Sequence, residues 1–101
     1  MSYAVSFSPE ALRQIDALED YIADSSGSTL TAERYISRLM NSCRSLGQSP
    51  YRGTAREDLG SGYRTTGFER RITILFAVIG ETVTIAGIYY GGRQHEGALT
   101  L

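Results

Sequence analysis

Two strand-like runs joined by a two-residue turn dominate the last third of the chain, and they constrain the fold more than any other feature. Residues 70–79 read RRITILFAVI and residues 82–90 read TVTIAGIYY, with Gly80-Glu81 between them. Glycine in the first turn position suits a type II′ hairpin turn. The first run is apolar at nearly every position, which is typical of a strand covered on both faces. The sequence therefore predicts a β-hairpin whose first strand is buried.

Two helices are predicted upstream of this hairpin. After a short alternating strand at residues 3–7, Ser8 is placed to cap a helix that has Pro9 at its first position, and Gly27 is placed to end it. The apolar positions have the spacing of one buried face, and they are Ala11, Leu12, Ile15, Leu18, Tyr21 and Ile22.

A second helix is predicted from Ser28 or Thr29 to the stop signals Gly47 and Pro50. Its buried face is predicted to hold Ala32, Tyr35, Ile36, Leu39, Met40, Cys43 and Leu46. The short joint makes the two helices an antiparallel hairpin, and the polar stretch 51–62 reads as turns. The order β-α-α-β-β-β predicts an α+β fold, in which an N-terminal strand and a two-helix hairpin pack on one face of a small antiparallel sheet.

Composition limits the class of protein. A chain of 101 residues with 42% hydrophobic and 21% charged residues suits one globular domain, here residues 1–101, with 94–101 expected to be a loose tail. Cys43 is the single cysteine and fits a reducing compartment. No signal peptide or bilayer-spanning run is evident, so we expect a cytoplasmic protein with no membrane partner.

The basic residues are unusual in kind rather than in number. Ten basic against eleven acidic residues give a net charge of −1, so no bulk attraction to nucleic acid is expected. All ten are arginine, which excludes a catalytic lysine. Arginine suits paired or interfacial sites because its guanidinium forks onto carboxylate or phosphate oxygens. GC-rich codon usage is the simpler cause of the bias.

An ordered set of short motifs runs along almost the whole chain. Its segments are Pro9-Glu10-Ala11, Ile15, Tyr21-Ile22-Ala23, Ala32-Glu33-Arg34-Tyr35, Leu39, Cys43, Leu46, Pro50, Gly53, Arg56-Glu57-Asp58-Leu59, Gly62-Tyr63-Arg64 and Ile88-Tyr89-Tyr90-Gly91-Gly92-Arg93. This set resembles the ParE branch of the RelE/ParE toxin superfamily. The resemblance implies the toxin of a type II toxin–antitoxin pair. It also implies a ParD-like or other small DNA-binding antitoxin as partner, and no cofactor or metal. ParE-like members are associated with DNA gyrase, whereas RelE-like members cut mRNA on the ribosome.

Arginines stand before the hairpin, at its start and just beyond its end, where a charge is costly unless something acidic binds. The candidate target-binding residues are therefore Arg64, Arg71, Tyr90 and Arg93. Each has a structural alternative. Arg64 could pair with Glu57 or Asp58 across neighbouring strands, and Tyr90 could simply pack on the sheet. Arg70 and Arg71 are adjacent, so strand alternation separates their side chains; we expect Arg71 to share a face with Thr73 and Leu75.

A ribonuclease is the main alternative to a protein-binding toxin. Its chemistry needs a base, cations beside the phosphate and an acid for the leaving oxygen. Arg64, Arg71 and Arg93 could supply the cations, Glu57 or Glu69 the base, and His95 the acid. The absence of lysine excludes a lysine-based site, and His95 falls in the expected loose tail. We therefore expect no catalytic residues and action through protein binding, and we also expect no direct sequence-specific DNA binding by this chain. A member that binds antitoxin without toxicity is the third possibility.

Overall fold

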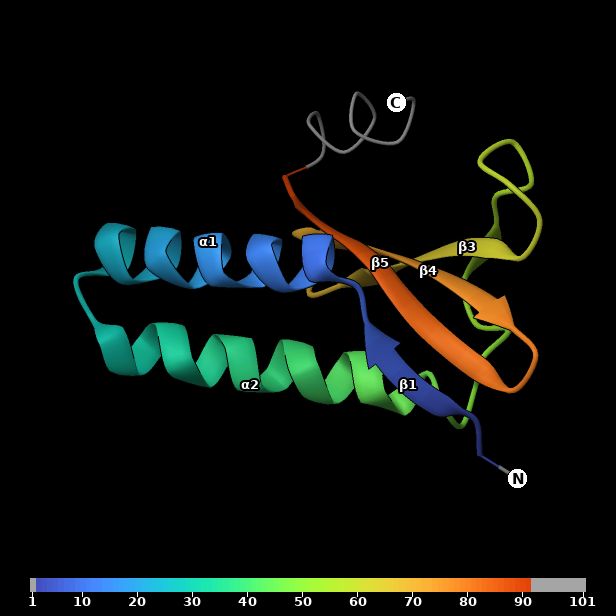
Figure 1. Ribbon diagram of the computed structural model, residues 1–101. Helices are drawn as coiled ribbons and strands as arrows, with labels where there is room; N and C mark the ends of the chain where they lie inside the picture. The colour runs from blue at the N-terminus through green and yellow to red at the C-terminus, as the bar shows by residue number, and fades with distance from the viewer. Residues whose placement is uncertain (1, 92–101) are drawn as a thin grey trace.

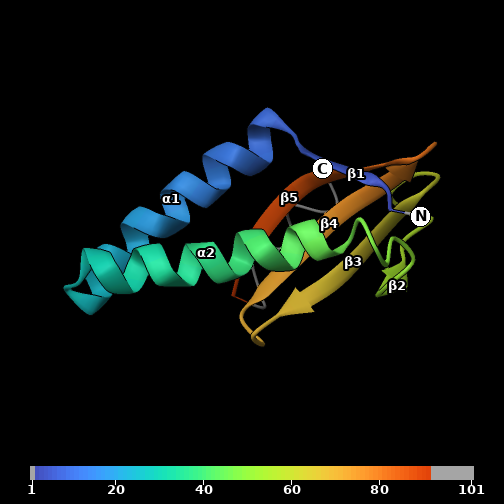
Figure 2. The same cartoon turned by 90° about the horizontal axis from the view of Figure 1, so that it is seen from below.

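The computed structural model describes residues 2–91. In chain order the elements are β1 (Ala4–Phe7), α1 (Pro9–Ser26), α2 (Thr29–Ser45), β2 (Thr54–Ala55), β3 (Tyr63–Phe68), β4 (Ile72–Ile79) and β5 (Thr82–Tyr90). The strands form one sheet in the order β1-β5-β4-β3-β2. The helices lie side by side as an antiparallel hairpin, and their distal halves extend beyond the sheet (Figures 1 and 2). The predicted α+β class is confirmed.

The sheet is mixed rather than wholly antiparallel, which corrects one part of the prediction. β1 pairs with β5 in parallel, with Ala4 opposite Thr82 and Phe7 opposite Ile85. A parallel pair needs a long crossover, and here the helical hairpin and three strands intervene. A two-residue strand, β2, also lies within the segment that reads as turns, and it pairs with β3.

The helix ends lie where the sequence places them. The Ser8 side chain accepts a hydrogen bond from the Ala11 amide at 3.0 Å, and Pro9 follows as the first helical residue. Gly27 ends α1 with φ of 72°, and its amide donates to the Ala23 carbonyl. Ser28 caps α2 by accepting from the Thr31 amide at 3.1 Å. The two caps leave only a short joint between the helices, which fixes the hairpin.

The buried face of α1 is narrower than predicted. Ala11, Ile15 and Leu18 are buried, whereas Leu12 is 46% exposed and Tyr21 is 54% exposed. Leu12 follows Ala11 directly, and one residue along a helix turns the side chain away from the core-facing stripe. The predicted face of α2 is confirmed, with Ala32, Leu39, Cys43 and Leu46 buried and Tyr35, Ile36 and Met40 packed at its margin.

The core lies between the helices and one face of the sheet (Figure 2). Ile72, Ile74 and Phe76 of β4 contribute to it together with Val83 and Ile85 of β5. Leu75 and Ala77 point to the other face of β4 and are nevertheless only 8% and 5% exposed. The prediction that β4 is covered on both faces is thus confirmed from Ile74 to Ala77, whereas Thr73 is half-buried and Ile79 is exposed. Gly80 has φ of 61°, as the first position of a II′ turn requires.

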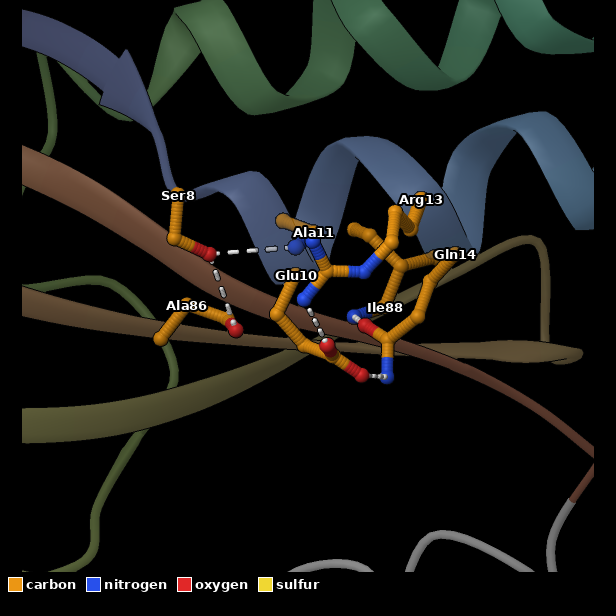
Figure 3. A network of polar contacts seen from close by, with 7 residues as sticks. All are labelled: Ser8, Glu10, Ala11, Arg13, Gln14, Ala86 and Ile88. Carbon is orange, nitrogen blue, oxygen red and sulfur yellow. Dashed lines mark hydrogen bonds and ion pairs between the residues drawn. The ribbon is translucent and has the colours of Figure 1, made fainter.

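A β-bulge in β5 fixes where α1 meets the sheet. Leu75 pairs with Gly87 and Phe76 pairs with Ile85, so Ala86 is an extra residue in β5. The Ser8 hydroxyl donates to the Ala86 carbonyl at 3.3 Å, and the Gln14 side-chain oxygen accepts from the Ile88 amide at 2.7 Å (Figure 3). Backbone groups beyond the end of β1 are therefore paired by the first turns of α1.

Candidate functional site

The turn between β3 and β4 is backbone-strained. The Arg71 amide donates to the Phe68 carbonyl at 3.1 Å, which closes a two-residue turn at Glu69 and Arg70. These central residues have φ of 49° and 63°. Two positive φ values define a type I′ turn, which normally carries Asn-Gly, and each non-glycine residue in this conformation costs about 1–2 kcal/mol. Arg70 therefore lies in a turn, and strand alternation does not govern where Arg70 and Arg71 point.

An ion pair ties this turn to α2. Arg38 donates to the Glu69 carboxylate through Nε at 2.8 Å and through Nη2 at 3.2 Å. These hydrogen bonds hold the pKa of Glu69 below its usual range. The Arg38 guanidinium also lies over the Tyr35 ring, 5.3 Å from its centroid. Glu69 is thus committed to Arg38, and a lowered pKa makes it a weaker base than an ordinary glutamate.

Arg71 and Tyr90, two of the predicted site residues, are brought together at the same end of the sheet. Arg71 Nη1 donates to the Tyr90 hydroxyl at 3.4 Å. The Tyr90 ring lies 5.5 Å from that of Tyr21 on α1, measured between ring centroids. Tyr90 pairs with Ile72 and packs against the helix-side core. Arg71 therefore reaches the helix side of the sheet, and the expectation that it shares a face with Thr73 and Leu75 is wrong.

Tyr35 completes the group. Its ring meets the Phe68 ring edge-on at 5.5 Å. Within the described chain its hydroxyl is buried without a hydrogen-bond partner. Burial and the nearby Glu69 carboxylate raise the pKa of this hydroxyl. We refer to Tyr35, Arg38, Glu69, Arg71 and Tyr90 as the turn cluster, in which aromatic rings and arginines meet between the helices and the β3–β4 turn.

The described chain ends beside the turn cluster. The Gly91 amide donates to the Arg71 carbonyl at 2.8 Å, which holds the end of β5 against the β3–β4 turn. Arg93 and His95 lie outside the described residues, as does the predicted tail 94–101. The sequence continues to Arg93 only two residues after Gly91.

Arg64 occupies a different place, at the opposite end of β3. Arg64 pairs with Phe76 of β4, and Phe76 lies five residues beyond Arg71 in the chain. At the usual rise per residue, five residues of strand separate Arg64 from Arg71 by roughly 16 Å. Its guanidinium donates to the carbonyls of Tyr51, Arg52 and Gly53, at 2.7, 3.1 and 3.3 Å. Arg64 therefore holds the loop that follows α2 through these three hydrogen bonds.

Asp58, one of the two acidic partners suggested for Arg64, pairs with Arg56 instead. Asp58 accepts two hydrogen bonds from Arg56, at 2.9 and 2.8 Å, and these lower its pKa. The interaction is local, between residues two apart, and forms in the loop that precedes β3. A cross-strand pair between Arg64 and Asp58 is therefore wrong, because carbonyl oxygens satisfy Arg64 instead.

Sequence reasoning missed most of the turn cluster. Arg38 and Tyr35 are three residues apart on α2 and so share one helix face, but nothing in the sequence places that face against residue 69. Glu69 was considered only as a possible base. A signal was present in the three consecutive charged residues 69–71, which interrupt the strand-like pattern immediately before the apolar run that begins at Ile72.

Neither helix within residues 2–91 is long and apolar enough to cross a bilayer. Over the same residues, no three His, Cys, Asp or Glu side chains gather closely enough to hold a metal ion.

Comparison with known proteins places this fold in a toxin class. The family model described as "ParE toxin of type II toxin-antitoxin system, parDE" matches residues 5–95. A solved structure titled "Chromosomal ParDE TA system from P. aeruginosa" matches with a TM-score of 0.77 and 22% identity, covering 90% of this chain and 98% of that one. No curated protein matches significantly. The chain belongs to the ParE toxin family of type II toxin–antitoxin systems.

Proposed function

We propose that this protein inhibits bacterial growth by binding DNA gyrase in the cytoplasm, and that a ParD-like antitoxin neutralises it. The observation that carries the proposal is the family match over residues 5–95, which spans both helices and all of the strands except Ala4 of β1. The similar solved structure is titled as a ParDE system, which supports a ParD-like partner. Action on gyrase comes from the resemblance to ParE-like toxins.

Three observations favour action by binding over RNA cleavage. The chain has no lysine. Arg64 clasps a loop far along the strand from Arg71, so these arginines do not flank one common phosphate position. Glu69 is ion-paired, with its pKa lowered, which disfavours it as a base.

We assign the contact with the target to Arg71, Tyr90 and Arg93. Arg71 and Tyr90 are adjacent at the end of the sheet where β5 finishes, and Arg93 follows closely in sequence. Arg71 is exposed, and within residues 2–91 its guanidinium makes one long hydrogen bond, which leaves N–H donors for a carboxylate of a partner. Arg64, also a candidate, contributes indirectly by holding the loop at residues 51–53.

The test is expression in a bacterial cell with and without the antitoxin encoded beside this gene. The toxin alone is expected to stop growth and induce the DNA damage response, and coexpression is expected to restore growth. Purified toxin is then added to gyrase, and supercoiling and cleaved DNA are measured. The mRNA 5′ ends are mapped in parallel.

Each outcome selects one function. Inhibited supercoiling with intact mRNA supports the proposal. New mRNA ends with unaffected gyrase replace it with a ribosome-dependent ribonuclease. Unchanged growth at high levels of folded protein identifies a member that binds antitoxin without toxicity.

A further inference from the structure

We propose that Arg70, at the tip of the β3–β4 turn, contacts an acidic surface of the toxin's protein target, and that the strained turn is retained because it presents this side chain. The inference rests on the proposed function, since it assumes a protein target. It adds a residue that neither strand alternation nor the family resemblance singled out.

The choice of residue at this turn is exceptional within the molecule. The described chain has eight residues with positive φ, and six of them are glycine: Gly27, Gly53, Gly60, Gly62, Gly80 and Gly91. The remaining two are Glu69 and Arg70, side by side. Glycine adopts positive φ without a steric cost. Within residues 2–91, the protein therefore has glycine at every other position with positive φ, and it has other residues only at this turn.

The fold itself accounts for Glu69 but not for Arg70. Glu69 is joined to Arg38 by two hydrogen bonds, which fasten the turn to α2. Among residues 2–91, Arg70 makes no hydrogen bond, ion pair or ring contact, and it is exposed. Backbone strain that internal contacts do not repay is a recognised mark of a functional position.

The charge at the turn indicates the kind of partner. Arg38 is neutralised by Glu69, while Arg70 and Arg71 follow each other with no acidic partner in the described chain. Two consecutive exposed arginines suit carboxylates on a protein surface, because a carboxylate can accept two parallel hydrogen bonds from one guanidinium. Arg70 is adjacent to Arg71, which we assign to the target contact, so the target is the occupant that best fits this tip rather than the antitoxin.

The test compares Arg70→Gly with the wild type. Glycine removes the charge and relieves the positive-φ strain, so the melting temperature is expected to equal or exceed that of the wild type. Affinity for purified gyrase is expected to fall about tenfold or more, and growth inhibition to fall with it, because a charge contact is lost. Affinity for the antitoxin should stay within about twofold of wild type.

Two further variants make the result decisive. Arg70→Asn keeps a side chain that tolerates positive φ, so it should also lose gyrase affinity without unfolding. Arg44→Glu reverses an exposed arginine near the C-terminal end of α2, away from the β3–β4 turn, and should bind gyrase like the wild type.

The outcomes separate this inference from the proposed function. If the wild type neither arrests growth nor binds gyrase, the proposed function fails. If the wild type binds gyrase and both Arg70 variants bind equally well, the inference is overturned. It is also overturned if these variants lose antitoxin and keep gyrase, because the occupant is then the antitoxin.

Discussion

The surroundings of a guanidinium decide what an arginine does in this protein. Arg64 lies within reach of three loop carbonyls, and its donors are used inside the fold. Among residues 2–91 the Arg71 side chain makes one long hydrogen bond, to Tyr90. Both residues stand out in the sequence for the same reason, as arginines beside β-rich runs. The loop that returns from α2 to β3 gives Arg64 its structural role, and no local sequence pattern reveals that return.

Replacing Arg64 should destabilise the fold. Arg64→Ala removes three hydrogen bonds that a charged donor makes to the exposed carbonyls at residues 51–53, and it is expected to lower the free energy of unfolding by about 1–2 kcal/mol. Arg64→Lys keeps the charge but loses the planar fork, so it should recover only part of that loss. Urea denaturation measures both variants. Wild-type midpoints for both would mean that the loop does not depend on this residue.

Cys43 should be inert in the native protein. It is fully buried, and burial raises the pKa of its thiol to about 12. At pH 8 only about one molecule in ten thousand then carries the reactive thiolate. A thiol reagent is expected to label the denatured chain within minutes and the native chain only at the rate of unfolding. Fast labelling without denaturant would contradict this packing of α2.

Among the elements, the bulge in β5 couples the sheet to α1. Gln14→Leu removes the acceptor of the Ile88 amide while keeping similar bulk. The unpaired amide should cost about 1–3 kcal/mol, and hydrogen exchange at Ile88 should accelerate more than at Ile74 in the neighbouring strand. Gln14→Glu retains an acceptor oxygen and serves as the matched control. Equal exchange at Ile88 in wild type and Gln14→Leu would show that Gln14 is not the cap.

The packing of α2 on β4 can be tested by truncating one large buried side chain on each element, Leu39 on α2 and Ile74 on β4. Leu39 and Ile74 are both fully buried in the same core. Either change to alanine is expected to cost about 2–5 kcal/mol, through lost burial and the cavity left behind. Leu12→Ala is the control, since Leu12 is 46% exposed and should cost far less. Equal melting temperatures for all three variants would mean that the buried and exposed faces of the helices are misassigned.

Elements governed by local signals were predictable, and long-range pairings were not. Ser8, Pro9 and Gly27 mark the limits of α1 because caps depend on neighbouring residues. The parallel pairing of β1 with β5 joins residues almost eighty positions apart, and both orientations are compatible with the same alternation. The candidate site divides in the same way. Tyr90 and Arg71 were predicted as members, but their contact depends on a turn whose positive φ values break the strand pattern.

At the scale of the whole molecule, Arg64 lies at the opposite end of the sheet from Arg70 and Arg71. Arg64 supports the end that carries the loop after α2, while Arg70 and Arg71 lie at the end where β3 turns and β5 finishes. Figure 1 shows the latter end beside the helical hairpin. Substitution of Arg70 or Arg71 should therefore alter binding to the target with little effect on folding.

The last prediction uses this separation. Arg93→Glu reverses a charge close in sequence to the end of β5, and a like charge against an acidic surface costs more than simple truncation. We expect it to abolish growth inhibition while the protein keeps the wild-type melting temperature and binds its antitoxin with near wild-type affinity. Arg93→Lys keeps the charge and should retain most of the toxicity. Growth assays, thermal melts and calorimetry with the antitoxin measure the three properties. Full toxicity in a folded Arg93→Glu variant would remove Arg93 from the target contact and leave Arg70, Arg71 and Tyr90 as its proposed members.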